Sequence, residues 1–467
     1  MYSVGSKEQG MSSEKFRHES WSSRSIFFLA AVGAAVGLGN IWRFPYLAGT
    51  SGGSAFVLIY LAAIIVIALP ILIAETMIGR HGHMSAPVSM ASAAREAGGS
   101  SYWSLVGWFG VVAGFLILTF YSVIGGWVLA YILKTVSGVF TDAGVAFVEA
   151  DFNQFLADPL SLIFWHTVFL GISIAVVSHG IKRGIEKAVS VMMPLLGIML
   201  LIIVGYALAV GDIAAGLSFL FAPDFSKIDD GVVLAAVGQA FFSVGVGMGI
   251  MFTYGAYLPD NIGIPRICFS IVMADTLVAL LAGIAIFPIV FANGLNEAAG
   301  PGLVFVTLPL AFGQMPGGAL FGTLFFILLA FAALTSAIAL LEGPVSWAEE
   351  QRGWSRRKSA VGIGGAIWLM GLGSVFSFNV WANFYPLSFV NKFSTSTVFE
   401  LVDFFTSNFL LVVGGLFISI FVGWNMKTGT LLRELSLSEG LVFNVWRVLV
   451  RIVCPIALAW VLISNWL

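Results

Sequence analysis

Eleven apolar segments, each long enough to cross a lipid bilayer, follow one another along this chain of 467 residues. A helix of about 20 apolar residues spans the hydrocarbon, where only helices or closed barrels can pair all their backbone polar groups. These segments are too long and too continuous for barrel strands. The sequence therefore predicts an all-α polytopic membrane protein with about eleven transmembrane helices. The segments lie at residues 24–48, 54–79, 103–136, 160–180, 186–211, 231–258, 266–292, 317–347, 359–376, 398–424 and 440–464.

The composition agrees with a chain that uses the bilayer as part of its solvent. Hydrophobic residues make up 59% of the chain and charged residues only 10%, whereas soluble domains carry about 25% charged residues. A net charge of −2 argues against nucleic acid as a partner. Cys268 and Cys454 both lie in apolar segments, so we expect buried small side chains there rather than a disulfide or a metal site.

The distribution of basic residues predicts the orientation. Lysine and arginine concentrate in the cytoplasmic loops of membrane proteins. With a cytoplasmic N-terminus, only three basic residues face outward, which are Lys134, Lys227 and Lys392. We therefore expect residues 1–23 to form a cytoplasmic N-terminal arm, and an odd number of spans places the C-terminus outside.

Two longer segments on the predicted outer side leave two interpretations open. They are Leu217–Asp230, before span six, and Asn293–Pro316, before span eight. Both could fold as short helices that cap an outer vestibule, and both could equally be passive connections.

Glycines interrupt the first and the sixth spans. Span one contains Gly33, Gly37 and Gly39, and span six contains Gly238, Gly245, Gly247 and Gly249. Either run alone would suit close helix packing. Their separation by five spans instead suggests two copies of one unit, spans one to five and six to ten, and paired broken helices are typical of a transporter's midplane site. An unwound turn offers carbonyls to a cation and helix N-terminal N–H groups to a carboxylate.

The stretch Gly37-Leu38-Gly39-Asn40, followed by Trp42-Arg43-Phe44-Pro45-Tyr46, resembles the signature of the neurotransmitter:sodium symporters, and in particular their bacterial amino-acid transporters. The resemblance extends from about Trp21 to span ten. It implies a leucine-transporter-type fold, in which two inverted five-helix repeats carry broken helices 1 and 6. The repeats would cover 24–211 and 217–424, with an additional eleventh helix at 440–464.

The resemblance implies two sodium sites. Sodium 1 would be held by Ala35, Asn40, Ser243 and Asp275. Sodium 2 would be held by Gly33, Val36, Ala332, Thr335 and Ser336. A structural alternative exists for each set, since Asp275 could be a hydrogen-bonded structural carboxylate and the Thr335 and Ser336 hydroxyls could bond back to their own helix.

Asp275 also bears on chloride. Animal relatives bind chloride at positions that match Tyr60, Gln239 and Ser243, together with a serine where this chain has Ala279. A fixed carboxylate at Asp275 would supply the negative charge instead. We therefore expect transport without chloride, and Asp275 could carry a proton on the return step.

The resemblance places the substrate between the two breaks. Its carboxylate would meet the N–H groups of Leu38 and Gly39 and the Tyr121 hydroxyl, and its amino group would meet carbonyls of Ala35, Phe242 and Ser243. The side-chain pocket would be lined by Ala34, Ile117, Tyr121, Phe242, Gly245, Met248, Ser336 and Leu340. Amine-transporting relatives place an aspartate where Gly37 stands, so the substrate is expected to bring its own carboxylate.

Gate residues follow from the same resemblance. Arg43 and Asp403 match an outer gate pair, with Phe242 and Tyr121 as an apolar lid. At the inner side Trp21 and Glu350 match gate positions, although His18 stands where relatives have arginine, with Arg17 beside it. In span five, Gly184 and Pro194 resemble the pair at which bacterial relatives unwind this helix.

These features predict a sodium-coupled symporter that imports a neutral, hydrophobic or aromatic L-amino acid with two sodium ions. It would lie in a bacterial inner membrane and would not be an enzyme. A non-protein amino acid or osmolyte such as GABA, taurine or betaine is an alternative substrate, and an ion channel is an alternative class. A channel needs a continuous polar path, whereas this chain concentrates polar groups at one depth. The sequence leaves the oligomeric state open.

Overall fold

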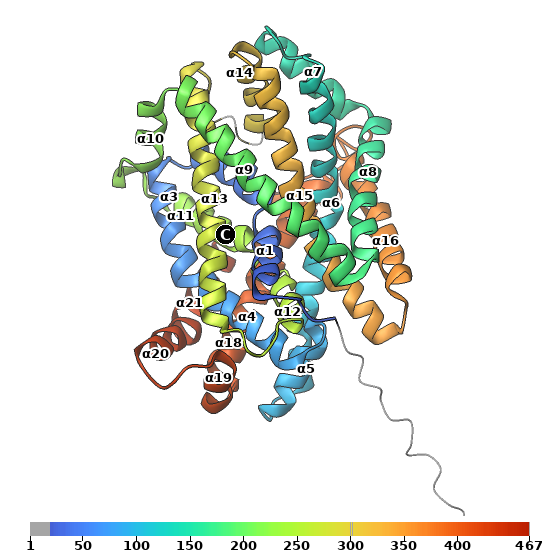
Figure 1. Ribbon diagram of the computed structural model, residues 1–467, viewed down its shortest axis with the longest axis vertical. Coiled ribbons are helices and arrows are strands. Elements are labelled where there is room, and N and C mark those ends of the chain that lie inside the picture. The colour runs from blue at the N-terminus through green and yellow to red at the C-terminus, as the bar shows by residue number, and fades with distance from the viewer. Residues whose placement is uncertain (1–18, 299, 301, 467) are drawn as a thin grey trace, which may run out of the picture.

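The computed structural model describes residues 19–298, 300 and 302–466, and its regular elements are helices (Figure 1). The first half contains α1 (Arg24–Ala35), α2 (Phe44–Thr50), α3 (Ser54–Ala63), α4 (Leu69–Gly82), α5 (Ala86–Glu96), α6 (Ser104–Val136), α7 (Val145–Ala157), α8 (Pro159–Ser178) and α9 (Glu186–Val210). The second half contains α10 (Ile213–Phe221), α11 (Asp230–Val244), α12 (Ile250–Ala256), α13 (Ile264–Ala292), α14 (Leu308–Gln314), α15 (Gly318–Arg352) and α16 (Arg356–Phe376). It ends with α17 (Val398–Phe404), α18 (Leu411–Ile420), α19 (Thr428–Leu435), α20 (Leu441–Val448) and α21 (Cys454–Ser464).

Short π-helical turns join several of these helices into longer rods. Those used below are η1 (Gly39–Arg43), η2 (Ile64–Ala68), η4 (Ile181–Ile185), η6 (Leu303–Thr307), η8 (Phe405–Leu410), η9 (Phe421–Asn425) and η10 (Leu449–Val453). Through η2 the helices α3 and α4 become one span, and η8 and η10 act in the same way for α17–α18 and α20–α21.

The predicted all-helical membrane architecture is confirmed. In the described part of the chain, nine helical stretches are long and apolar enough to cross a bilayer, and the bent pair formed by α1 and η1–α2 brings the number to ten. The remaining predicted segment, 231–258, contains α11 and α12, and each is too short to cross alone because the loop at 245–249 separates them. The division into two five-helix repeats remains a prediction.

Both outer segments that the sequence left undecided contain short helices. The first overlaps α10, which begins at Ile213, before the predicted segment starts. The second contains η6 and α14. In Figure 1, α10, α14 and α7 lie towards one end of the molecule, and α5, α19 and α20 lie towards the other.

Small residues let backbones pack directly against one another around α12. A Cβ atom on Gly79 of α4 would overlap the Phe252 carbonyl, and one on Gly255 of α12 would lie 2.5 Å from the Thr76 carbonyl oxygen. On the other side, a Cβ on Gly110 of α6 would lie 2.8 Å from the Gly249 Cα. Close approach through small residues is the usual way in which helices pack in a membrane, and here it holds α12 against α4 and the loop before α12 against α6.

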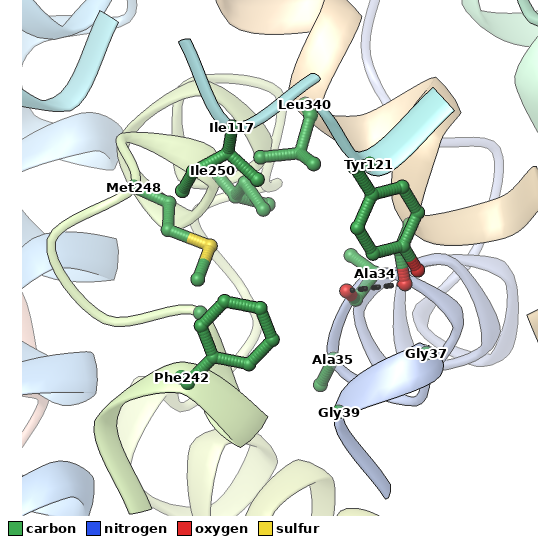
Figure 2. A pocket seen from close by; sticks show the side chains of 12 residues that line it. Ala34, Ala35, Gly37, Gly39, Ile117, Tyr121, Phe242, Met248, Ile250 and Leu340 are labelled. Atoms are coloured by element: carbon green, nitrogen blue, oxygen red, sulfur yellow. Dashed lines mark hydrogen bonds between the residues drawn. The ribbon is translucent and has the colours of Figure 1, made fainter. Parts of the chain in front are cut away.

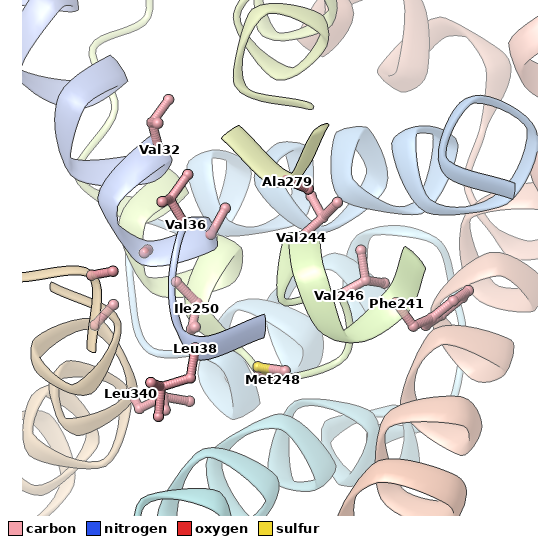
Figure 3. Packing of buried hydrophobic residues seen from close by; sticks show 14 of the residues in the cluster. Val32, Val36, Leu38, Phe241, Val244, Val246, Met248, Ile250, Ala279 and Leu340 are labelled. Atoms are coloured by element: carbon pink, nitrogen blue, oxygen red, sulfur yellow. The ribbon is translucent and has the colours of Figure 1, made fainter. Parts of the chain in front are cut away.

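Buried aliphatic side chains surround both helix breaks. Figure 3 shows Val32 and Val36 beside the first break on one side of the core and Val244 and Ala279 across from them. All four are buried, with exposed fractions of 6% or less. The breaks therefore lie in an apolar interior, where free backbone groups have to find partners inside the protein.

Candidate functional site

The first span breaks between Ala35 and Gly39, and the helices on either side meet at 48°. Gly37 lies inside this break. A Cβ atom there would lie 2.5 Å from the Ser336 hydroxyl oxygen and 2.8 Å from the Tyr121 hydroxyl oxygen. The absence of a side chain therefore lets span one approach α6 and α15 closely enough to share polar contacts with both.

The sixth span breaks over five residues between α11 and α12. Gly245, Gly247 and Gly249 have φ angles of 72°, 80° and 73°, in the left-handed region that only glycine adopts at little cost. The freed N–H of Gly247 donates to a carboxylate oxygen of Glu75 at 2.5 Å. Alternate glycines thus hold an unwound segment whose backbone is partly satisfied by a buried acid on α4.

Three polar side chains meet where the two breaks face α13. The Asn40 amide nitrogen lies 2.7 Å from one carboxylate oxygen of Asp275 and 3.0 Å from the Ser243 hydroxyl. The Ser243 hydroxyl donates to the other Asp275 oxygen at 2.6 Å. All three residues are buried. Of the predicted sodium 1 set, these three form one compact polar cluster, and Ala35 lines the cavity beside it. Asn40 presents its amide nitrogen to this cluster, while its side-chain oxygen accepts from the Gly37 N–H at 3.2 Å.

The residues at the chloride-related positions surround the same cluster. The Tyr60 hydroxyl lies 3.4 Å from the Ser243 hydroxyl, and Gln239 donates to the Gly39 carbonyl at 2.7 Å. Ala279 is fully buried and offers only a methyl group to this cluster. Asp275 is therefore the negative group of this cluster among the described residues.

The second predicted sodium set divides into two parts. The Ser336 hydroxyl reaches across from α15 to the carbonyls of Gly33, Ala34 and Val36 at 3.4, 3.1 and 3.4 Å. The Thr335 hydroxyl instead donates to carbonyls of its own helix, including that of Ala332 at 3.1 Å. Both side chains lie beside span one, since a Cβ placed on Gly33 would lie 3.2 Å from the Thr335 Cβ.

A cavity lies between the two breaks (Figure 2). In the figure, Tyr121, Ala34 and Ala35 lie on one side and Phe242, Met248 and Ile117 on the other. The lining residues are Ala34, Ala35, Gly37, Gly39, Ile117, Tyr121, Phe242, Gly245, Met248, Ile250, Ser336 and Leu340.

Two predicted substrate residues lie outside this cavity. Leu38 lines the neighbouring outer cavity, and its N–H donates to the Tyr121 hydroxyl at 3.2 Å. Ser243 turns into the polar cluster with Asp275. Conversely, Gly37 and Ile250 line the cavity without having been predicted to do so.

The predicted outer gate residues line a second cavity without forming an ion pair with one another. The Arg43 guanidinium lies over the Phe242 ring, 4.4 Å from its centre. Asp403 accepts a hydrogen bond from Ser407 at 2.9 Å. No ion pair within 4 Å joins Arg43 and Asp403, both of which the structure describes. Arg43 and Asp403 therefore both line the outer cavity. Phe242 lies between this cavity and the inner one.

At the opposite side of the cavity, Trp21 is packed into the protein. It is 2% exposed, its indole N–H donates to the Tyr254 carbonyl at 3.0 Å, and its backbone N–H donates to the Tyr257 carbonyl. Glu350 accepts hydrogen bonds from the backbone and hydroxyl groups of Ser85, at the start of α5. His18 and Arg17 lie outside the described residues.

Besides Gly37, three site residues were missed from sequence. Glu75 and Glu342 are fully buried acids on α4 and α15. Glu75 bonds Gly247, and Glu342 pairs with Arg356 and accepts from the Tyr257 hydroxyl at 2.8 Å. An ionisable residue inside an apolar span is itself a signal of function, so both acids could have been found. Ile250 carried no such signal.

Span five contains the predicted Gly184 and Pro194. Gly184 lies in η4, where a Cβ would overlap the Val176 carbonyl at the end of α8. Pro194 lies inside α9, which continues without a break from Glu186 to Val210. Helical unwinding at this pair is absent from this conformation of the described chain.

Two broken helices that enclose a cavity and a buried carboxylate cluster define a membrane transporter with a midplane site. The profile of the sodium:neurotransmitter symporter family matches residues 18–151 and 147–467, and the chain belongs to this family. It is therefore a sodium-dependent symporter, in a family of transporters rather than enzymes.

Relatives support this assignment along nearly the whole chain. An uncharacterized sodium-dependent transporter of Bacillus subtilis (strain 168) is 38% identical over 441 residues, 94% of this chain and 95% of the relative. One of Haemophilus influenzae is 32% identical over 466 residues, 97% and 100% of the two chains. The crystal structure of MhsT in complex with L-phenylalanine matches with a TM-score of 0.88 and 42% identity, covering 96% of this chain and 100% of MhsT. The predicted leucine-transporter-type fold is confirmed.

Proposed function

We propose that this symporter imports a neutral L-amino acid with a hydrophobic or aromatic side chain, together with two sodium ions and without chloride. The observation that carries the proposal is the cavity between the two helix breaks. It has polar groups from span one at one side and an apolar wall at the other. An amino acid has the same division, since its charged end and its side chain lie at opposite ends of the molecule.

The charged end of the substrate would lie against the first break. The Leu38 N–H and the Tyr121 hydroxyl now bond one another at 3.2 Å. Both could turn to a substrate carboxylate, and a charged acceptor would strengthen those hydrogen bonds. Gly37 brings no charge of its own, so a substrate with its own carboxylate fits this position.

The side chain of the substrate would lie against Ile117, Phe242, Met248 and Leu340. The space beside Gly245 is bordered by Ile250 and Met248, whose atoms would lie 3.5 and 3.7 Å from a Cβ placed on Gly245. These are ordinary contact distances. A flexible methionine in this wall can adjust to an aromatic or a branched side chain. The solved relative MhsT, at 42% identity, was crystallised with L-phenylalanine, which supports this substrate class.

Sodium would couple to substrate through shared groups. Asn40, Ser243 and Asp275 would hold sodium 1, with Ala35 contributing a carbonyl, and the substrate carboxylate would complete the shell. Ser336 and the carbonyls of Gly33 and Val36, with Ala332 and Thr335, would hold sodium 2. Each ligand then raises the affinity for the other by the same factor, which is the thermodynamic basis of symport.

We further propose an N-terminus in the cytoplasm of a bacterial cell and alternating access between two gates. The gate at the N-terminal side, around Trp21, would be closed in this structure. The outer gate would form when Arg43 and Asp403 approach each other over Phe242. The ordered packing of Trp21 and the separation of Arg43 from Asp403 support this assignment.

A thermal-shift screen with purified protein tests the proposal. Amino acids such as phenylalanine, leucine and tryptophan should raise the melting temperature in sodium chloride and in sodium gluconate, and should have no effect when choline replaces sodium. Stabilisation by GABA, taurine or betaine alone would indicate the alternative substrate class. A strict requirement for chloride would refute the role given to Asp275.

A further inference from the structure

A broad, open hollow lies at the N-terminal end of α9, apart from the transport cavity. We call it the basic hollow, and its lining residues are Ile26, Lys182, Arg183, Glu186, Lys187 and Ser190. Lys182 and Arg183 belong to η4, which the chain enters through Gly180, with a φ of 83°. The turn at Gly180 and the two helical elements that follow it therefore bring three cationic side chains to one rim.

The charges of the basic hollow do not cancel. Lys182, Arg183 and Lys187 are exposed, and none of them forms an ion pair within the described part of the chain. The one acid in the lining is Glu186, and both of its carboxylate oxygens accept hydrogen bonds from Ser22, each at 2.8 Å. A second acid, Glu19, lies beside the hollow, where its carboxylate accepts from the Lys182 backbone N–H. Three cations against two engaged carboxylates still leave a net positive hollow that suits an anion.

An apolar strip begins directly beside these cations on the same helix. From Lys187, steps of three and four residues along α9 lead to Val191, Leu195, Ile198 and Ile202, which therefore share one face of the helix. These side chains are 54%, 43%, 55% and 43% exposed. In a membrane protein, such a face lies against lipid acyl chains.

We propose that the basic hollow binds the phosphate headgroup of an anionic phospholipid whose acyl chains lie along the exposed face of α9. Clusters of lysine and arginine at the end of a membrane helix attract anionic headgroups, each cation contributing about 1 kcal/mol. The charge of the hollow selects the headgroup, and the apolar strip beside it selects a lipid over a soluble phosphate. The inference needs only the bilayer and holds for any transported substrate.

A lipid at this position would lie beside the N-terminal segment, because residues of that segment form hydrogen bonds with residues of the basic hollow. Ser22 bonds Glu186, and a carboxylate oxygen of Glu19 accepts from the Lys182 backbone N–H at 3.1 Å. The headgroup would thus sit next to the segment that carries Trp21.

Native mass spectrometry of the full-length protein in detergent tests the proposal. The protein is titrated with palmitoyl-oleoyl phosphatidylglycerol, with the matching phosphatidylcholine, and with glycerol 3-phosphate as the headgroup alone. The test variant is Lys182→Gln/Arg183→Gln/Lys187→Gln. The control variant, Arg266→Gln/Arg357→Gln/Lys427→Gln, removes the same charge from exposed cations outside the hollow.

We expect the test variant to bind phosphatidylglycerol about a hundredfold more weakly, since each of the three cations contributes about fivefold, and the control variant to stay within about threefold of the native protein. Equal losses in both variants, or no loss in the test variant, would overturn the proposal. Binding of glycerol 3-phosphate at the concentrations at which the lipid binds would overturn the role of the acyl chains. If the triple variant loses its native melting transition, Lys182→Gln and Lys187→Gln are measured singly, each with an expected loss of about fivefold.

Discussion

Replacing Asp275 with asparagine tests the electrostatic part of the proposed sodium 1 site. The substitution keeps the size of the side chain and removes its charge, which is fully buried and held by Asn40 and Ser243. Two unit charges about 4 Å apart interact by about 4 kcal/mol at an effective dielectric constant of about 20. That energy corresponds to about a thousandfold in affinity. Because asparagine keeps one oxygen for the ion, we expect a loss of sodium affinity between about one hundredfold and one thousandfold.

The assay is equilibrium binding of radiolabelled phenylalanine at increasing sodium concentration. In Asp275→Asn the sodium concentration for half-maximal binding should rise steeply. Added chloride should recover part of the loss, because an anion could then supply the missing charge beside Tyr60 and Gln239. Asp212→Asn is the control, since Asp212 caps α10 through the Ala215 N–H rather than joining the cluster. A shift of less than about threefold in Asp275→Asn, with native folding, would show that the carboxylate has only a structural role.

Three further substitutions test other parts of the site. Ser336→Ala removes the hydroxyl that faces the span-one carbonyls and should raise the half-saturating sodium concentration about tenfold in the same assay; an unchanged value would exclude Ser336 from sodium binding. Gly247→Ala forces a side chain into a left-handed backbone 2.6 Å from the Leu411 carbonyl oxygen and should lower the melting temperature by several degrees, whereas a native melting temperature would argue against this loop geometry. Trp21→Ala removes a buried indole, a change that costs about 3–5 kcal/mol in a packed core. Hydrogen exchange of the backbone amides around Tyr254 should become faster. Protection from exchange equal to that of the native protein would count against an inner gate at this position.

The helix breaks could be predicted from sequence because a left-handed backbone favours glycine, so clustered glycines mark where a helix unwinds. Gly245, Gly247 and Gly249 alternate in a segment that is otherwise apolar, and all three take left-handed φ angles. The meeting of Asn40 with Asp275 came from a resemblance to a family rather than from spacing. Sequence separation alone gives no distance between side chains that lie 235 residues apart.

Other features depend on details that a sequence does not record. Thr335 and Ser336 both lie beside span one, but the Thr335 hydroxyl bonds its own helix and the Ser336 hydroxyl reaches the span-one carbonyls, a difference that depends on the rotation of α15 and on the side-chain rotamers. The distance between Arg43 and Asp403 depends on the conformation of the transporter, and one sequence serves all of its conformations. The bond between Glu350 and Ser85 depends on α5, a short helix that the pattern of apolar segments did not reveal.

The unwound loop of span six limits how the specificity of this transporter can evolve. Gly247 and Gly249 have no room for a side chain, since a Cβ on either would press on the backbone of Leu411 or Gly110, and Gly245 shares their left-handed φ. The intervening positions are free of this constraint, and Met248 already faces the cavity. New substrate preferences should therefore arise at Met248 and Ile250 and on α6, while the three glycines stay invariant. A library for directed evolution should vary those side chains rather than the glycines of the loop.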